Sequence, residues 1–199
     1  YSASILSEID PDAIMAVFPA DHTIAIPKGF CELLEQAEIV ATNNHLVTLG
    51  IDPTTPKTGY GYIKQGQAID CGAFKVNKFV EKPNEATAKK YLEEGSYYWN
   101  SGMFVWKVSA LLNEIETHLP KLHAQLDALT INTIEAKGKY PYRIFNESGK
   151  KKFESLESIS IDYGLMEKSS NTAVLPANIG WNDVGAWTAL SDVSAKDSQ

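Results

Sequence analysis

The chain has 199 residues, of which 44% are hydrophobic and 22% are charged. This length suits one domain with a sizeable core, and the composition is close to the globular average, which argues against a disordered chain. The formal net charge of −7 argues against a nucleic-acid binder, and no apolar run is long enough to span a bilayer. An acidic protein can still bind phosphates if a divalent cation neutralises both partners.

The first fifty residues predict helix, strand, helix and strand in turn. A short apolar run that ends at Pro19 is typical of a strand buried on both faces of a parallel sheet. Apolar residues at helical spacing predict the helix that follows, and a strand, helix and strand in this order form a βαβ unit with a right-handed crossover. The predicted elements are a helix that ends at Ile9, a strand over 13–18, a helix over 27–41 and a strand over 45–50.

The pattern changes after residue 50, where a loop rich in Pro and Thr precedes alternating, half-exposed strands. Asn84 is a suitable N-cap and Gly95 a suitable C-terminal residue for the next helix. Ser109 is expected to cap a later helix, and Pro120 to begin another. The predicted elements are strands over 61–64, 74–80, 103–107 and 172–175, helices over 85–94, 109–119 and from 120 onward, a helical stretch over 163–168, and a turn that leads into a helix over 181–190. We therefore expect one α/β domain over residues 1–199 with a mixed sheet.

The two cysteines, Cys31 and Cys71, stand in no metal or redox spacing. Reduced thiols in a cytosolic protein are therefore favoured over a metal site or a disulfide. We expect a cytoplasmic protein whose partners are small molecules rather than nucleic acid or a membrane.

Two aspartates stand next to predicted strands or turns. Asp21 directly follows the first apolar run, and ligands of open α/β sheets bind at the carboxyl ends of the strands. Asp21 is therefore a candidate for a metal or substrate contact, although a cap of a turn is an equally good interpretation. Asp183 lies in a turn flanked by glycines, where it is either a plain N-cap or a second carboxylate directed at the site of Asp21.

Three further motifs hold polar groups that suit a sugar phosphate. Glu81 and Lys82 offer a hydroxyl acceptor beside a cation, although a solvated charge pair is the simpler interpretation of these residues alone. Asn100 stands beside an aromatic cluster, an arrangement that can hold a sugar ring but more often marks core packing. Gly59, before a strand, lets the backbone approach a ligand closely, or simply marks the entry to a hairpin.

The order of these motifs resembles that of the sugar-1-phosphate nucleotidyltransferase family. The amino acids within the motifs are most similar to those of bacterial mannose-1-phosphate guanylyltransferases. The resemblance extends from about residue 13 to about residue 193. The motifs are Phe-Pro-Ala-Asp-His at 18–22, Thr-Gly-Tyr-Gly-Tyr at 58–62, Val-Glu-Lys-Pro at 80–83, Trp-Asn-Ser-Gly-Met-Phe at 99–104, Ile-Asp-Tyr-Gly-Leu-Met-Glu-Lys at 161–168 and Gly-Trp-Asn-Asp-Val-Gly at 180–185.

The resemblance implies a Rossmann-like α/β nucleotidyltransferase domain with a mixed, mainly parallel sheet flanked by helices. It also implies the transfer of GMP from GTP to mannose-1-phosphate with Mg²⁺, which gives GDP-mannose and pyrophosphate for polysaccharide biosynthesis. A glucose-type transferase with another nucleotide, a non-catalytic sugar-phosphate-binding domain of the same fold and a purely structural fragment remain open as alternatives.

The resemblance also assigns roles to residues, in a metal pair and a sugar-phosphate set. The metal pair, for Mg²⁺, is Asp21 and Asp183, and these two residues are expected to be catalytic together with Lys82. The sugar-phosphate set is Lys82 for the sugar-linked phosphate, Glu81 and Asn100 for sugar hydroxyls, Gly59 for a backbone contact, and Asp162 in the sugar-side motif.

One departure from the family pattern concerns the triphosphate. The family carries a glycine-rich loop with an arginine and a lysine after its first strand, and this sequence contains nothing like it and no initiator Met. We therefore expect an N-terminally truncated domain that lacks the triphosphate-binding segment and is inactive on its own. Sheet edges exposed by such a truncation favour self-association, so a homo-oligomer is a hypothesis.

Overall fold

A computed structural model of the chain describes residues 1–130, 133–136, 142–185 and 189. The chain forms two compact units, the first from residues 1–15 and 107–169 and the second from residues 16–106 and 170–199. None of the helices in the described ranges has the length and hydrophobicity that a bilayer crossing needs.

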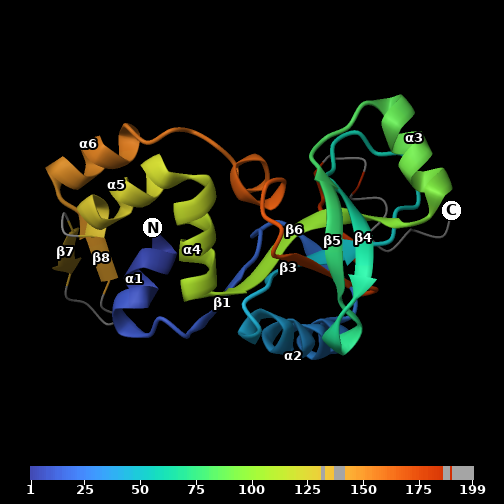
Figure 1. Ribbon diagram of the computed structural model, residues 1–199, viewed down its shortest axis with the longest axis horizontal. Helices are drawn as coiled ribbons and strands as arrows, with labels where there is room; N and C mark the ends of the chain where they lie inside the picture. Colours follow the sequence, from blue (N-terminus) through green and yellow to red (C-terminus); the bar gives the residue numbers. More distant parts are fainter. Residues whose placement is uncertain (131–132, 137–141, 186–188, 190–199) are drawn as a thin grey trace, which may run out of the picture. The chain divides into compact units, whose positions relative to one another are not determined.

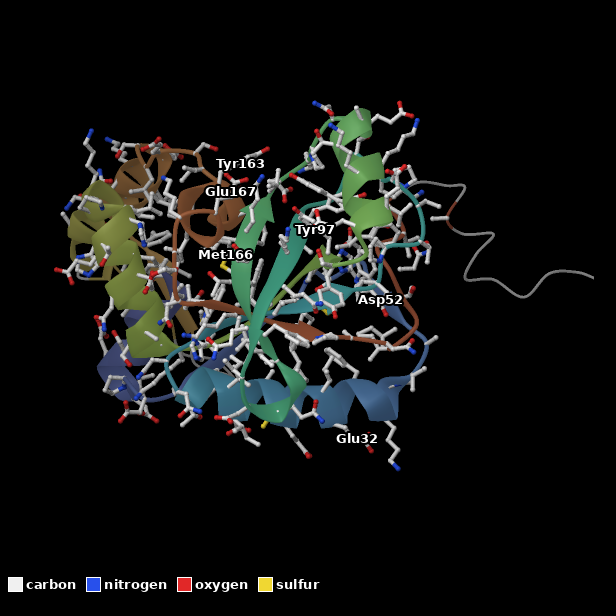
Figure 2. The ribbon with its side chains drawn as sticks, turned by 45° about the vertical axis from the view of Figure 1, so that its right-hand side comes forward. Glu32, Asp52, Tyr97, Tyr163, Met166 and Glu167 are labelled. Atoms are coloured by element: carbon white, nitrogen blue, oxygen red, sulfur yellow. The ribbon has the colours of Figure 1, made fainter. Side chains whose placement is uncertain are left out.

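The first unit is mainly helical (Figure 1). Within it, α1 packs on α4 and α5, and α5 packs on α6. Its elements are α1 (Ser2–Ile9), α4 (Val108–His118), α5 (Pro120–Thr130), β7 (Thr133–Ala136), β8 (Tyr142–Phe145), α6 (Glu147–Glu154) and the single π-helical turn η2 (Asp162–Met166). Tyr163, Met166 and Glu167 are labelled at this turn in Figure 2. The helix from Pro120 and the helical stretch near 163–168 are thereby confirmed.

The predicted cap at Ser109 is wrong. α4 begins one residue earlier, at Val108, and no side chain caps it. The reason lies in the backbone, because the amides of Val108 and Ser109 donate to the carbonyl oxygens of Ala13 (2.9 Å) and Pro11 (3.1 Å). These bonds satisfy N–H groups that a capping hydroxyl would otherwise serve.

A six-stranded sheet in the order β1-β6-β3-β9-β5-β4, with β4 also paired to β6, makes up most of the second unit, which begins within β1 and includes β6 as far as Trp106. The strands are β1 (Ile14–Val17), β3 (Leu46–Ile51), β4 (Tyr62–Ala68), β5 (Phe74–Val80), β6 (Tyr97–Lys107) and β9 (Thr172–Pro176). β3 and β9 lie in the middle of the sheet, and Leu46, Val47 and Leu49 of β3 are completely buried. This strand pair forms the core on which the rest of the unit packs.

The α/β fold with a mixed sheet is confirmed, but the expectation of mainly parallel strands is wrong. Among the described pairings β3–β9 is parallel, whereas β3–β6, β4–β5, β4–β6 and β5–β9 are antiparallel. A short connection through η1 (Asp70–Gly72) joins β4 to β5 and makes them antiparallel neighbours. β6 lies between β1 and β3, so the two strands of the expected βαβ unit are not adjacent.

The burial expected for the first strand is also wrong. β1 is the end strand of the sheet, so it has a neighbour on one side in this chain. Val17 is 39% exposed and Phe18 is 41% exposed as a result. A continuous apolar run does not by itself distinguish a central strand from an edge strand.

The two long helices of the second unit agree closely with the prediction. α2 (Pro27–Thr42) packs on β3, and Leu33 and Ala37 are among its buried residues, while its residue Glu32 is exposed (Figure 2). α3 (Glu85–Glu94) begins at the cap Asn84, whose side chain accepts a hydrogen bond from the Thr87 amide at 2.9 Å. It ends at Gly95 in the left-handed conformation, with φ of 67°. Local capping chemistry thus set both ends of this helix.

Candidate active site

A two-stranded ribbon joins distant parts of the second unit. β2 (Thr23–Ile24) pairs antiparallel with β10 (Trp181–Asn182), with Trp181 opposite Ile24 and Asn182 opposite Thr23. Asp21 precedes β2 and Asp183 follows β10. Because the strands are antiparallel, both aspartates leave the same end of the ribbon. The helix expected after Asp183 falls on residues 186–190, most of which lie outside the described part of the chain.

Gly180, directly before β10, allows the backbone to lie close to Ala25, directly after β2. Its φ is +63°, and a Cβ atom at this position would lie 2.6 Å from the Cβ of Ala25. We expect Gly180→Ala to lower the free energy of unfolding by clearly more than the 1–2 kcal/mol, roughly, of the left-handed conformation alone. Gly95→Ala is the matched control, because Gly95 has a φ of +67° but no atom within 4 Å of its Cβ position. Equal losses in urea denaturation of the two variants would contradict the close approach at Gly180.

Asp183 is held by its own turn and by Tyr60. The Tyr60 hydroxyl donates a hydrogen bond to Asp183 Oδ1 at 2.8 Å, and Asn182 Oδ1 accepts one from the Val184 amide at 2.8 Å. Val184 has a φ of +48°, which is rare for a β-branched residue and is a strained conformation of the kind that gathers at functional sites. Burial raises the pKa of Tyr60, and the Asp183 carboxylate raises it further, so the phenol remains a donor.

Asp21 is much more exposed than Asp183. Its side chain is 83% exposed, and its Oδ1 lies 4.0 Å from His22 Nε2. His22 is oriented by Trp181, whose Nε1 donates to His22 Nδ1 at 3.0 Å. An indole nitrogen can only donate, so Nδ1 accepts and the proton of the neutral imidazole is on Nε2, which faces Asp21.

Glu81 and Asn100 meet over Gly61. The side chain of Glu81 is only 8% exposed, and its Oε1 lies 3.0 Å from Lys82 Nζ. A Cβ atom on Gly61 would overlap Glu81 Oε2 and lie 3.1 Å from the Cβ of Asn100. The Asn100 amide also donates to the Gly61 carbonyl oxygen at 2.8 Å. Gly61, which the sequence did not single out, is therefore the surface on which both polar side chains rest.

The side-chain amide of Asn100 has a fixed orientation. Its Oδ1 accepts hydrogen bonds from Thr48 Oγ1 at 3.0 Å and from the Gly102 amide at 3.2 Å. These two bonds identify Oδ1 as the acceptor end of the amide and Nδ2 as its donor end. Gly102 has a φ of +70° in an irregular part of β6, and its Cβ position lies 3.7 Å from the ring of Pro19. The irregular part of β6 next to Asn100 therefore adjoins Pro19, two residues before Asp21.

An aromatic cluster of Tyr60, Trp99 and Trp181 joins the metal pair to the sugar-phosphate set. The ring centroid of Tyr60 lies 5.1 Å from that of Trp99 and 5.7 Å from that of Trp181, both in edge-on contact. Trp99 precedes Asn100, and Trp181 stands two residues before Asp183. Tyr60 thus contacts Asp183 directly, and the next residue, Gly61, adjoins Glu81 and Asn100.

The remaining three predicted residues, Lys82, Gly59 and Asp162, differ in backbone conformation, exposure and place in the fold. Lys82 has a φ of +48°, a second strained non-glycine residue beside the site, and its side chain is 57% exposed. Gly59 is exposed, with no atom within 4 Å of its Cβ position, so its backbone is open to a ligand. Asp162 belongs to the first unit, where it begins η2 and its carbonyl oxygen accepts from the Glu167 amide at 3.0 Å.

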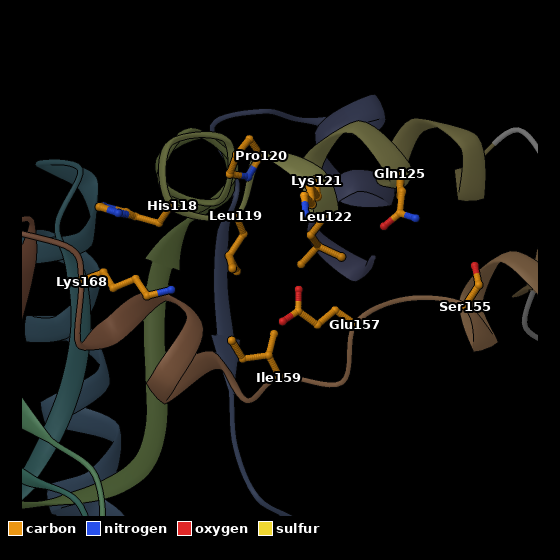
Figure 3. A pocket seen from close by; sticks show the side chains of 10 residues that line it. All are labelled: His118, Leu119, Pro120, Lys121, Leu122, Gln125, Ser155, Glu157, Ile159 and Lys168. Atoms are coloured by element: carbon orange, nitrogen blue, oxygen red, sulfur yellow. The ribbon is translucent and has the colours of Figure 1, made fainter.

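A cavity of about 450 Å³ opens in the first unit where α4 meets α5 (Figure 3). Lys121, Lys168 and Glu157 line it together with the apolar side chains of Leu119 and Ile159. None of the predicted site residues lines this cavity, so it carries no part of the candidate site.

Comparison with known proteins identifies the family of the chain. A family model described as nucleotidyl transferase matches residues 2–199. The chain belongs to the nucleotidyl transferase family. The resemblance inferred from the motifs is therefore confirmed at the level of the family.

Proteins about 40% identical to this nucleotidyl transferase chain are named for mannose-1-phosphate guanylyl transfer or for xanthan biosynthesis. The mannose-1-phosphate guanylyltransferase of Salmonella muenchen is 41% identical over 196 residues, which are 98% of this chain and 40% of that protein. The xanthan biosynthesis protein XanB of Xanthomonas campestris pv. campestris is 43% identical over 188 residues, 94% of this chain and 38% of that protein. The chain thus spans about 40% of the length of the curated relatives that it matches.

A solved structure supports the same fold for the nucleotidyl transferase chain. The protein named mannose-1-phosphate geranyltransferase from Thermus thermophilus matches with a TM-score of 0.82 at 32% identity. The match covers 98% of this chain and 53% of that one.

Proposed function

We propose that this chain forms the sugar-phosphate and metal side of a mannose-1-phosphate guanylyltransferase. The observation that carries the proposal is the meeting of Glu81 and Asn100 over Gly61, with Lys82 beside Glu81. The names of the relatives support mannose as the sugar and guanine as the base. Both compact units are part of one catalytic domain in this proposal.

The reaction transfers GMP from GTP to mannose-1-phosphate. A phosphate oxygen of the sugar phosphate attacks the α-phosphorus of GTP, the bond from that phosphorus to the bridging oxygen of the β-phosphate breaks, and pyrophosphate leaves. The attacking phosphate is already ionised near neutral pH, so no side chain has to remove a proton. Lys82 holds the sugar-linked phosphate, Glu81 accepts hydrogen bonds from sugar hydroxyls, and Asn100 donates to them.

Asp21 and Asp183 are the residues that would hold Mg²⁺. Both offer hard carboxylate oxygens at the same end of the ribbon, and Asp183 has one oxygen fixed by Tyr60. Within the described part of the chain, no group of three or more His, Cys, Asp or Glu side chains could hold a metal. Two carboxylate ligands from the protein suit Mg²⁺, because this ion keeps several water or phosphate oxygens in its coordination sphere. The bound ion would neutralise the charge of the phosphates.

Mannose-1-phosphate binding to the 199-residue chain tests the proposed function. Isothermal titration calorimetry with Mg²⁺ should give heat of binding for mannose-1-phosphate and a clearly weaker affinity for glucose-1-phosphate. Tighter binding of glucose-1-phosphate would favour the glucose-type alternative. Absence of binding to either sugar phosphate would contradict the assignment of this side of the site.

Lys82→Gly should separate binding from stability. Loss of the ammonium should weaken mannose-1-phosphate binding about 10- to 100-fold, the usual range for a charged hydrogen bond. Two effects on the free energy of unfolding oppose each other and should leave a small net change, because glycine adopts a φ of +48° without strain but removes the ammonium that pairs with the nearly buried Glu81 carboxylate. Asn44→Gly, at a φ of +65°, is the control that should gain stability without losing affinity. Calorimetry and urea denaturation provide the two measurements, and unchanged affinity in Lys82→Gly would remove Lys82 from the phosphate site.

We also place this activity in the cytoplasm, in the supply of nucleotide sugar for polysaccharide biosynthesis. Cys31 and Cys71 are exposed free thiols, which suits a reducing compartment. The xanthan biosynthesis protein among the relatives supports a role in polysaccharide formation.

A further inference from the structure

Tyr60 stands between the two groups of the candidate site, and no role in the reaction described above falls to it. We infer that Tyr60 is a positioning residue that orients the Asp183 carboxylate for the divalent cation. The inference rests on the proposed function, because it takes Asp183 as a metal ligand. It starts from the 2.8 Å hydrogen bond that the Tyr60 hydroxyl donates to Asp183 Oδ1, between residues that are 123 positions apart in the chain.

The position of the Tyr60 hydroxyl is fixed by packing. The ring contacts Trp99 at an interplanar angle of 72° and Trp181 at 66°, so two rigid aromatic side chains touch it. Tyr60 also packs against the buried cluster that contains Tyr62 and Tyr91. A side chain held in this way loses little further freedom when its hydroxyl donates, so the hydrogen bond defines one place for Asp183 Oδ1.

Asp183 needs such a partner because its turn is tight and strained. Val184 follows at a φ of +48°, and the Cβ position of Gly185 lies 3.0 Å from Asp183 Oδ2. With Oδ1 bound to Tyr60, the carboxylate can turn only within narrow limits, and Oδ2 is the oxygen directed to a cation. Hydrogen bonds to a ligating carboxylate orient metal ligands in this way.

The other aspartate shows the contrast. The side chain of Asp21 is 83% exposed, and the neighbouring His22 Nε2 lies at 4.0 Å, which is beyond hydrogen-bond distance. Asp183 is therefore oriented before the cation arrives, whereas Asp21 adjusts to the cation after it binds. Removal of the Tyr60 hydroxyl should then weaken the cation site through Asp183 alone.

The test compares Tyr60→Phe with Tyr98→Phe in the 199-residue chain. Tyr98 is the matched control, because its hydroxyl also donates to a side chain, Gln65 Oε1, at 3.1 Å in a half-buried position. Mn²⁺ titration followed by electron paramagnetic resonance, in the presence of mannose-1-phosphate, measures the affinity of the cation site. Tyr60→Phe should raise the Kd for Mn²⁺ about 10- to 100-fold, the range seen for partners of metal ligands. Tyr98→Phe should leave that Kd close to the original value, although both variants lose one hydroxyl and keep the ring.

A third variant, Asp183→Asn, separates this inference from the proposed function. If Asp183→Asn weakens Mn²⁺ binding and Tyr60→Phe does not, Asp183 remains a ligand and Tyr60 is not its positioning residue. If Asp183→Asn has no effect, or the original chain binds no Mn²⁺, the metal assignment itself fails, and this inference fails with it. Equal losses in Tyr60→Phe and Tyr98→Phe would mean that both act through stability, which also overturns the positioning role.

Discussion

Asp183→Asn is expected to lower the rate of GMP transfer by on the order of a hundredfold or more, the usual cost of removing a preorganised charge. The asparagine keeps the shape of the side chain and an Oδ1 atom that can still accept the hydrogen bond from Tyr60. The fold should therefore survive, while the negative charge that holds Mg²⁺ is lost. The strained turn at Val184 should also persist, because its bond to Asn182 does not involve Asp183.

Pyrophosphate release from GTP and mannose-1-phosphate, over a range of Mg²⁺ concentrations, measures this loss in the enzyme that carries the chain. Asp52→Asn is the matched control, because it removes the same charge from an exposed carboxylate in the loop after β3 (Figure 2). The control should retain its kcat and its Mg²⁺ dependence. A kcat for Asp183→Asn equal to that of Asp52→Asn would exclude Asp183 from the metal site.

Gly61→Ala should strongly weaken mannose-1-phosphate binding. The added methyl group would occupy the place of Glu81 Oε2 and press on the Cβ of Asn100. The clash falls on the end of the Glu81 side chain, so it should displace the carboxylate from its position beside Lys82. Displacements of about 1 Å in groups that position a substrate can cost on the order of a hundredfold, and here two such groups move together. Stability should fall less, by about 1–3 kcal/mol, the usual cost of adding a methylene to a packed site.

Calorimetry with mannose-1-phosphate and thermal melts of the same samples test this expectation. Gly29→Ala, in the first turn of α2, is the control, since it adds the same methyl group where the nearest atom is an Ile26 methyl at 3.3 Å. Gly59→Ala is a separate arm, because its methyl group enters open space and any loss would report ligand contact at Gly59 itself. Normal affinity in Gly61→Ala would contradict the meeting of Glu81 and Asn100 at Gly61.

Local chemistry predicted the individual elements well. β5 and α3 have the predicted bounds, because alternation marks the strand and Asn84 and Gly95 mark the helix ends. β6 begins at Tyr97, six residues before the predicted start at 103, because the aromatic run at its beginning has no alternation of polar and apolar residues. The prediction of mainly parallel strands was wrong, because tertiary packing decides which strands pair and a short stretch of sequence does not contain this information.

The sequence likewise predicted some residues of the candidate site and missed others. The family order of the motifs pointed to Asp21, Glu81, Lys82, Asn100 and Asp183, and their metal-binding and sugar-binding roles remain predictions. Tyr60 and Gly61 were missed, although they stand in the motif that supplied Gly59. Their importance comes from contacts with residues far along the chain, such as the bond from Tyr60 to Asp183, which the sequence does not encode locally. The alternation of glycine and tyrosine over 59–62 was the available signal.

Thr48 is the only polar side chain in β3, and its buried hydroxyl donates to Asn100 Oδ1 at 3.0 Å. A residue of the hydrophobic core thus fixes which end of the Asn100 amide accepts hydrogen bonds and which end donates them. Valine has nearly the same shape and would satisfy the packing of this strand, yet it would release one of the two bonds that keep the amide from turning over. If Asn100 binds a sugar as proposed, attempts to change sugar selectivity should accordingly begin with Thr48, in the layer beneath Asn100, before exposed residues are altered.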